Sequence, residues 1–283
     1  MDGRATSTLE ARPALAFASR VAAAPDRRLA AAMSSLVEHL DTMVAELDLT
    51  RDDLRAILCF LTEVGDVCSE QRQEWVLLAD TLGLSSMVES QAARRPAGAT
   101  PNTLPGPFYR PDAPARSDGE TISLDGRGVA LAFNAQVTDL DGDPVERAQV
   151  EVWHANDLGL YENQDPDMQP EFNLRGVFTT DSKGCVTIRT VRPAGYTMPA
   201  DGPVGQLAQR LGLGLRRPAH LHFRIAAPGF QTLTTHVFDA SDPDIGRDPL
   251  FAVQPELLTD FKPDAGGLRA NYRFVLARQK TRA

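Results

Sequence analysis

The sequence has few of the residues from which disulfide frameworks and thiolate metal sites are built. Only three of its 283 residues are cysteine, and only five are histidine. Cys59, Cys68 and Cys185 are scattered and form no C-x-x-C pair, which argues against a disulfide framework and against a cysteine zinc site. Reduced thiols are typical of the cytoplasm, so we expect a cytoplasmic protein.

Long apolar runs and positive charge are also scarce. No uninterrupted apolar stretch approaches the roughly 20 residues that span a bilayer, so we do not expect a membrane protein. The short apolar stretch 13–19 follows Asp2 and Glu10, and we interpret it as part of a tail rather than a signal peptide. The 29 basic residues face 38 acidic ones, a net charge of −9, which argues against nucleic acid because phosphate contacts need a basic surface.

What remains is an ordinary globular composition, at a length that supports a large core. Four segments differ in pattern. Residues 1–28 are rich in Ala, Arg, Ser and Pro without periodicity, and we expect a mobile N-terminal extension. Residues 29–92 have helical patterning, and residues 93–120 form a linker loop dense in Pro and Gly. Residues 121–283 have the pattern of strands.

Apolar residues recur at steps of three and four in the helical segment. The stripes include Leu36, Leu40, Met43, Leu54, Leu58 and Leu61. Thr50 and Asp53 have the spacing of a capping box at the start of the second helix. A third helix is expected from about Ser69, with Gly83 as its stop signal. These stripes need a covering surface, either the following domain or a second copy of the chain.

The C-terminal segment alternates between apolar and polar residues, as strands do. Residues 129–137 alternate at Val129, Leu131, Phe133, Ala135 and Val137. Turn signals at 181–184 and 228–229 predict hairpins over 176–191 and 221–238, and 203–216 has a short helical pattern. Short strands without intervening helices indicate an antiparallel sandwich or barrel. We therefore predict a mainly β protein, an antiparallel β-sandwich preceded by an N-terminal α-helical domain.

Two of the five histidines stand one residue apart in RPAHLHF. In a strand His220 and His222 would project from the same face, which suits a metal because neutral imidazole is a common ligand. The alternative is the polar face of an exposed strand. Tyr161 and Tyr196 lie in irregular loops, where a tyrosine is more often half-buried packing than a ligand.

Four motifs, in this order, resemble the intradiol ring-cleaving dioxygenases. They are LPGPFYRPDAP, GLYENQ, RPAGYTMPADGP and RRPAHLHF. Upstream, RQEWVLLADTLGLS resembles the N-terminal domain of the catechol and hydroxyquinol branch of that family. The resemblance covers about residues 30–278, and it identifies the β-domain as catalytic and the helical domain as a dimerisation domain.

The resemblance implies an enzyme with one Fe(III) per subunit. Its ligands would be two tyrosinates and two histidines, here Tyr161, Tyr196, His220 and His222. The implied reaction is cleavage of a catechol-type aromatic diol by O2 to a cis,cis-muconate. Tyr196 would leave the metal when the diol chelates it, and would take up a proton. Arg217 would stabilise negative charge on the ring, and the alternative for it is a surface arginine at a strand entrance.

The resemblance also implies a substrate pocket. Its expected residues are Leu77, Asp80, Leu104, Pro105, Gly106, Pro107, Phe108, Met198, Pro199 and Leu250. Asp80 is polar in a mostly apolar wall, which suits the third hydroxyl of hydroxyquinol (1,2,4-trihydroxybenzene), a group that catechol lacks. The product would then be 3-hydroxy-cis,cis-muconate (maleylacetate). The alternative for Asp80 is a solvent-facing residue on the helix surface.

Other features bear on the same choice of diol. The motifs DGPVGQL and THVFDASDP resemble the hydroxyquinol branch, with His236 where the catechol branch is expected to carry glutamine. Phe108 is larger than the leucine typical of catechol enzymes. Pro105 departs from the hydroxyquinol pattern, which keeps catechol and chlorocatechol as alternatives. Protocatechuate is less favoured, because that branch lacks the helical domain.

In this branch the helical domain forms a homodimer interface that encloses a phospholipid, so we expect both here. Two other classes of protein stay open. One is a zinc or copper enzyme that uses the two histidines without tyrosine. The other is a non-catalytic β-sandwich binding module that retains the family fold.

Overall fold

The structure, a computed structural model, describes residues 13–69 and 72–279. It divides the chain into two compact units, Met1–Glu63 and Val64–Ala283, whereas the sequence placed the main boundary after residue 92. The last two helices of the predicted helical segment therefore belong to the same unit as the strands. Among the described helices, none combines the length and the apolar character needed to cross a membrane.

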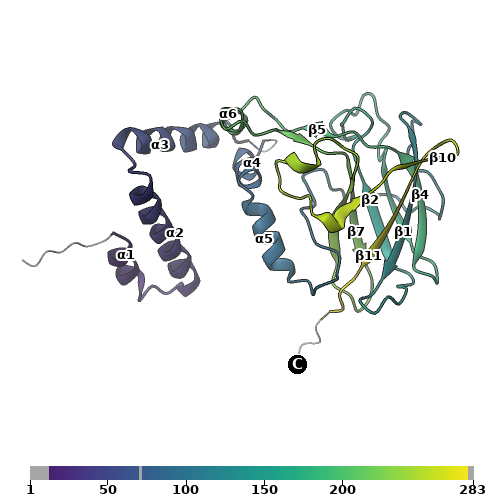
Figure 1. The fold of residues 1–283 in the computed structure, drawn as a ribbon, viewed down its shortest axis with the longest axis horizontal. Coiled ribbons are helices and arrows are strands. Elements are labelled where there is room, and N and C mark those ends of the chain that lie inside the picture. The colour runs from purple at the N-terminus through teal and green to yellow at the C-terminus, as the bar shows by residue number, and fades with distance from the viewer. Residues whose placement is uncertain (1–12, 70–71, 280–283) are drawn as a thin grey trace, which may run out of the picture. The chain divides into compact units, whose positions relative to one another are not determined.

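The first unit is helical (Figure 1). It contains α1 (Pro13–Val21), α2 (Arg27–Glu46) and most of α3 (Arg51–Asp66). Within the extension expected over residues 1–28, α1 and the first residues of α2 are helical even though the sequence there has no apolar periodicity, because PALAFASRV consists mostly of residues that tolerate a helix. Residues 1–12 of that extension lie outside the described residues, and its mobility stays a prediction.

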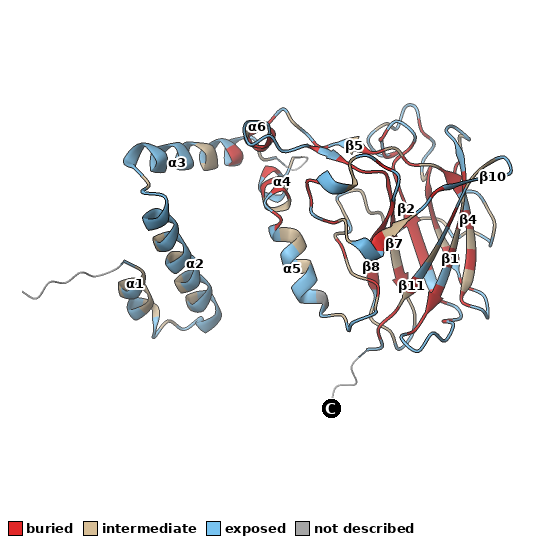
Figure 2. Ribbon diagram, viewed as in Figure 1, coloured by how far each residue is buried: buried red, intermediate tan, exposed pale blue. Residues whose placement is uncertain are grey.

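The predicted cap of α3 is present, and the apolar stripes of α2 and α3 lie at the surface of the single chain. The capping box is present at the start of α3: the Thr50 amide donates to Asp53 Oδ2 (2.8 Å) and the Asp53 amide donates to Thr50 Oγ1 (3.2 Å). The apolar stripes of both helices are largely exposed in the single chain, as Figure 2 shows. Leu36, Leu40, Met43, Leu54 and Leu58 are exposed and Leu61 is partly buried.

Two short helices stand where the sequence predicted one. Helix α4 (Glu74–Thr81) begins later than expected, and Gly83, with φ +75°, ends it as predicted before α5 (Leu84–Ala93). The buried Glu74 carboxylate accepts from the Val204 amide at the start of α6 (Pro203–Arg210), over 3.1 Å. It also pairs with Arg72. This bond fixes α4, and with it Asp80, against the segment that follows Tyr196.

Two large β-sheets form the sandwich of the second unit (Figure 1). The first contains, in order, β10 (Lys262–Asp264), β11 (Gly267–Val275), β1 (Ala130–Thr138) and β4 (Cys185–Val191). The second contains β3 (Arg175–Thr179), β2 (Gln149–Trp153), β7 (His220–Ala226), β8 (Leu233–Asp239) and β9 (Leu258–Thr259). A small ladder joins β5 (Tyr196–Thr197) to β6 (Arg216–Arg217). Short 3₁₀ turns span Ile245–Arg247 and Pro255–Leu257.

The strand pairing departs from the sequence prediction in two respects. The sheets are mixed, because β1 pairs with β11 and β8 pairs with β9 in parallel. The turn at Asp181–Gly184 forms, but its flanking strands pair in different sheets, β3 with β2 and β4 with β1. A turn signal fixes a chain reversal, whereas long-range packing decides which sheet each strand joins. The hairpin of β7 and β8 and the helix α6 are confirmed.

The sandwich core lies between the two sheets, and strand alternation builds it. In β1 the predicted inward residues are buried: Leu131, Phe133, Ala135 and Val137. Val129 precedes the strand and is 55% exposed, contrary to the predicted pattern. In β7, Leu221, Phe223 and Ile225 enter the same core. His220 and His222 therefore project from the opposite, outer face of the second sheet.

We expect Phe223→Ala to destabilise the second unit by about 3–5 kcal/mol, because its ring packs between other buried aromatic rings and its removal leaves a cavity. Urea unfolding followed by tryptophan fluorescence measures the change, since Trp153 is buried in the same unit. Val129→Ala is the exposed control, with an expected change below about 0.5 kcal/mol. Equal effects of the two substitutions would contradict this account of the core.

Candidate metal centre

The two histidines of RPAHLHF lie side by side on the outer face of β7. Their Nε2 atoms are 3.3 Å apart, and His220 and His222 are 2% and 1% exposed. An exposed polar strand, the alternative that the sequence left open, is therefore wrong. The other side chains of the site come from the loop after β2 and from strands β5, β6 and β8.

The surroundings prepare both imidazoles to bind a cation. His220 Nδ1 lies 2.7 Å from the Pro218 carbonyl oxygen, which only accepts, so Nδ1 carries the proton and Nε2 keeps its lone pair. Burial lowers the pKa of His220 well below its usual range, and the positive Arg217 adds to the effect. Burial, His220 and Arg217 likewise lower the pKa of His222. Both rings are neutral, the form in which histidine binds metals.

The structure brings both predicted tyrosines to these histidines. Tyr161, in the loop after β2, has its hydroxyl 2.9 Å from His222 Nε2 and is 1% exposed. Tyr196, in β5, has its ring centroid 5.7 Å from that of His220 and 6.0 Å from that of Tyr161. Two tyrosine rings and two imidazoles thus come together in one place, in which Tyr196 alone is partly buried rather than buried. This is the arrangement that the sequence could only suggest.

The buried Tyr161 phenol needs a cation nearby to ionise. Burial raises its pKa well above the usual value and Tyr196 adds to the rise, whereas Arg217 and Arg175 oppose it. A bound metal ion reverses this preference, because its charge favours the phenolate.

Close backbone approach holds the loops of the site together. A Cβ on Gly195 would overlap the carbonyl oxygen of Arg217, so the residue before Tyr196 has to be glycine. Gly106 has φ +71°, and a Cβ there would lie 3.2 Å from His222 Cε1. The Pro- and Gly-rich linker loop therefore passes directly over a predicted metal ligand.

Arg217 is buried at the centre of the site and is not the surface arginine of the alternative reading. Its Nη1 lies 3.2 Å from the Tyr196 hydroxyl and 3.4 Å from His220 Nε2. Its Nε donates to Asp248 Oδ1 over 3.1 Å, and this ion pair orients the guanidinium. Within the described residues its Nη2 has no hydrogen-bond partner, so it can donate to a bound anion.

Sequence reasoning missed His236 as a member of this cluster. It stands on β8 directly opposite His222, with ring centroids 4.3 Å apart. Nitrogen atoms of His220, His222 and His236 all lie within 4.8 Å of one another. Thr103 contacts His236 Nδ1, while Nε2 is buried with no partner in the part of the chain that the structure describes. The predicted turn at 228–229 could have revealed this pairing.

Aromatic rings pack against the candidate ligands. Trp153 of β2 stacks on His222, with centroids 4.8 Å apart and an interplanar angle of 11°. Phe108 of the linker loop stacks on Tyr161 at 4.4 Å and 24°. These rings restrict the orientation of one histidine and one tyrosine and help to exclude water from the site.

The predicted pocket residues fall into three groups. Gly106 approaches His222, and Phe108 stacks on Tyr161. Leu77, Met198 and Leu250 belong to an apolar cluster in which Met198 and Leu250 are buried. Leu104 is partly buried, and the exposed residues are Pro105, Pro107 and Pro199.

Asp80 is partly buried rather than on the open helix surface. Burial raises the pKa of its carboxyl, and a hydrogen bond from Ser85 and the charge of Arg217 oppose that rise. Asp80 therefore lies within electrostatic reach of the buried guanidinium. The part that these residues play in binding a substrate stays a prediction.

Both the N-terminal helical segment and the C-terminal β-domain of the chain are similar to known proteins. Residues 26–100 match the family model of the catechol dioxygenase N terminus, and residues 104–278 match the family model described as dioxygenase. The chain is 43% identical to hydroxyquinol 1,2-dioxygenase of Rhizobium sp. (strain MTP-10005) over 254 residues. That alignment covers 90% of this chain and 86% of the relative.

Solved structures show the same relationship. The crystal structure of hydroxyquinol 1,2-dioxygenase from Pseudomonas putida DLL-E4 matches with a TM-score of 0.90 and 37% identity, covering 94% of this chain and 98% of that one. Wild-type catechol 1,2-dioxygenase of Acinetobacter radioresistens matches with a TM-score of 0.73 and 29% identity, covering 90% and 87%. The resemblance carried by the four motifs is confirmed, and the chain belongs to the family of intradiol ring-cleavage dioxygenases that includes the hydroxyquinol and catechol 1,2-dioxygenases.

Proposed function

We propose that this enzyme is a ferric dioxygenase that cleaves hydroxyquinol with O2 to 3-hydroxy-cis,cis-muconate (maleylacetate), with one Fe(III) per subunit. The observation that carries the proposal is the convergence of two tyrosine side chains and two imidazoles, of which Tyr161, His220 and His222 are buried and Tyr196 is partly buried. Catechol and chlorocatechol are the alternative substrates.

The donor set fits a ferric ion. Fe(III) is a hard cation that favours anionic oxygen, and the phenolates of Tyr161 and Tyr196 would offset two of its three charges. His220 and His222 are neutral and add nitrogen ligands without adding charge. When bound, Fe(III) draws electron density from a chelated diol and so makes the ring reactive toward O2.

The chain's own residues bind, orient and move protons. Tyr196 is less buried than Tyr161, and its oxygen lies beside Arg217. It is therefore placed to accept a proton from a diol hydroxyl, while Tyr161 stays fixed by the ring of Phe108. Arg217, oriented by Asp248, can stabilise the negative charge that develops on the substrate ring.

Two observations favour hydroxyquinol among the diols. The Asp80 carboxylate is partly buried within reach of the charge of Arg217, where it can accept a hydrogen bond from a third hydroxyl. The hydroxyquinol 1,2-dioxygenase of Pseudomonas putida is also more similar in structure than the catechol enzyme of Acinetobacter radioresistens.

The helical stripes support a homodimer. Exposed leucines on α2 and α3 form apolar faces that a second copy of the chain would cover, and the resemblance adds a phospholipid enclosed at that interface. A cytoplasmic location completes the proposal, on the basis of three free cysteines.

Ligand assignment is tested by colour. We expect the iron-loaded protein to show a tyrosinate-to-Fe(III) charge-transfer band in the visible spectrum, and the double variant Tyr161→Phe with Tyr196→Phe to lack it. Tyr109→Phe is the matched control, because its hydroxyl donates to Glu151 instead, and it should keep the band. A colourless or blue wild-type protein, or a double variant with unchanged colour, would contradict the assignment.

Substrate choice is tested by O2 uptake with hydroxyquinol and with catechol. We expect faster uptake with hydroxyquinol, and we expect Asp80→Ala to lower kcat/KM for hydroxyquinol about 10–100-fold, the loss of one hydrogen bond to a charged group. The value for catechol should change by less than about 3-fold, since catechol lacks the third hydroxyl. Asp260→Asn, an exposed carboxylate, is the control. Equal losses for both diols would overturn this role of Asp80.

The dimer is tested by sedimentation. Charges on the stripes, Leu40→Glu with Leu58→Glu, should convert a dimer to a monomer because they place carboxylates in an apolar interface. Leu140→Glu, at an exposed turn after β1, should leave the dimer intact. A monomeric wild-type protein, or a double variant that stays dimeric, would disprove this interface.

A further inference from the structure

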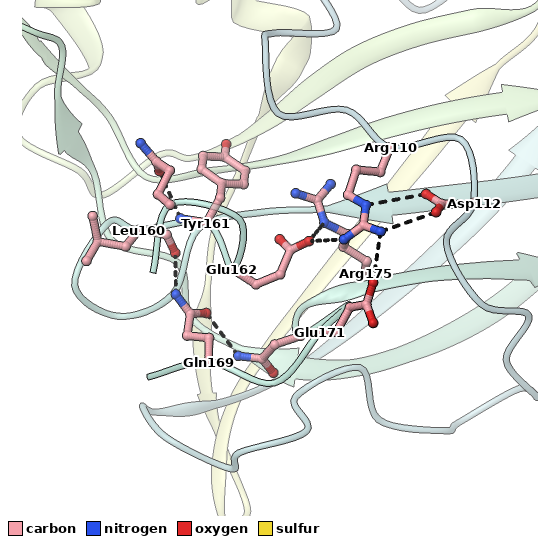
Figure 3. A network of polar contacts seen from close by, with 10 residues as sticks. Arg110, Asp112, Leu160, Tyr161, Glu162, Gln169, Glu171 and Arg175 are labelled. Carbon is pink, nitrogen blue, oxygen red and sulfur yellow. Dashed lines mark hydrogen bonds and ion pairs between the residues drawn. The ribbon is translucent and has the colours of Figure 1, made fainter. Parts of the chain in front are cut away.

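A buried ion pair lies beside Tyr161. Arg175 Nε donates to Glu162 Oε1 over 2.7 Å, and the two side chains are 1% and 4% exposed. The same oxygen accepts from Arg110 Nη1 over 3.3 Å. Figure 3 shows the carboxylate of Glu162 directed at both arginines, while Arg110 continues to Asp112 and Glu171.

This pair ties the Tyr161 loop to the sheet. Glu162 directly follows Tyr161, and Arg175 is the first residue of β3. Two further bonds hold the backbone at Tyr161 and at the residue before it: the Tyr161 amide donates to Gln164 Oε1 (3.0 Å), and Gln169 Nε2 donates to the Leu160 carbonyl (3.2 Å) (Figure 3). The position of the phenol is thus fixed by polar contacts on both sides of its residue.

Stability alone does not account for the pair. Removing two charges from water costs several kcal/mol per ion, and an apolar pair of the same size is often as stable. The same loop holds Phe172 and Leu174 at φ +60°, a conformation that is unfavourable for both side chains. Strain and buried charge in one loop are typical of a functional site.

The pair also sets the charge near Tyr161. The guanidinium carbon of Arg175 is 5.9 Å from the centroid of the Tyr161 ring. Its Nη2 is buried without a hydrogen-bond partner among the described residues. The Glu162 carboxylate accepts from both Arg175 and Arg110. Loss of Arg175 removes a positive charge near Tyr161, whereas loss of Glu162 removes a negative one.

We propose that Glu162 and Arg175 are positioning residues, which hold Tyr161 at the metal and balance the charge beside its ring. The proposal rests on the proposed function, since it needs a tyrosinate on iron. Neither residue touches the substrate in this role. Both act through the phenol oxygen that binds the cation.

The visible band of the iron-loaded protein tests the proposal. Positive charge near a phenolate lowers the energy of its donor electrons, so Arg175→Met should move the charge-transfer band to longer wavelength. Glu162→Gln keeps the volume but removes negative charge, and should move the band to shorter wavelength. Arg175→Met should also lose its iron at a chelator concentration roughly 10–100-fold lower than the wild-type protein does. This is the usual loss of metal affinity when a residue that orients a metal ligand is removed.

Two further variants complete the design. Arg175→Lys keeps the positive charge but loses the planar set of guanidinium donors. Its band should therefore lie at the wild-type position, while its iron retention stays reduced as in Arg175→Met. Arg269→Met breaks an exposed ion pair between β10 and β11 and should change neither property. If Arg175→Met does not fold, the direction of the shift in Glu162→Gln carries the test.

The outcomes separate the two proposals. Bands that shift in opposite directions, with weaker iron binding, support the positioning role. Unchanged bands, or shifts in the same direction, overturn it even where the melting temperature falls, because a purely structural pair would lower stability alone. A wild-type iron protein without the band would instead overturn the proposed function.

Discussion

The two faces of β7 are the constraint on which the rest of the site depends. Leu221, Phe223 and Ile225 are held in the sandwich core, so the residues between them are forced onto the outer face of the sheet. A shift of one residue would bury the histidines in the core and expose Phe223. The large core therefore fixes His220 and His222 more firmly than any contact within the site.

Loops complete what the strand begins, and each is fixed by its own means. The Tyr161 loop is tied to β3 by buried charge. The Tyr196 segment pairs with Arg217 in a two-strand ladder, where glycine allows close backbone approach. The linker loop reaches His222 through Gly106. The site is thus assembled on one face of a rigid sheet from segments that lie far apart in the sequence.

Local patterns could be predicted from the sequence, and long-range choices could not. The capping box at Thr50, the alternation of β1 and the hairpin of β7 and β8 depend on neighbouring residues, and the structure has all three. The parallel pairing of β11 and the separation of β3 from β4 depend on packing across the whole domain. The assignment of Tyr161 and Tyr196 as metal ligands came only from the resemblance to the family. His236 was accessible through strand register, whereas nothing in the spacing of Glu162 and Arg175 indicates a buried pair.

The proposed metal site lies among two tyrosines and two histidines rather than on the three-histidine cluster. Anomalous diffraction at the iron edge, from crystals of the iron-loaded protein, tests this most directly. We expect one anomalous peak within bonding distance of the oxygens of Tyr161 and Tyr196 and of nitrogens of His220 and His222. A peak within bonding distance of His220, His222 and His236, but not of the tyrosine oxygens, would contradict the proposed ligand set.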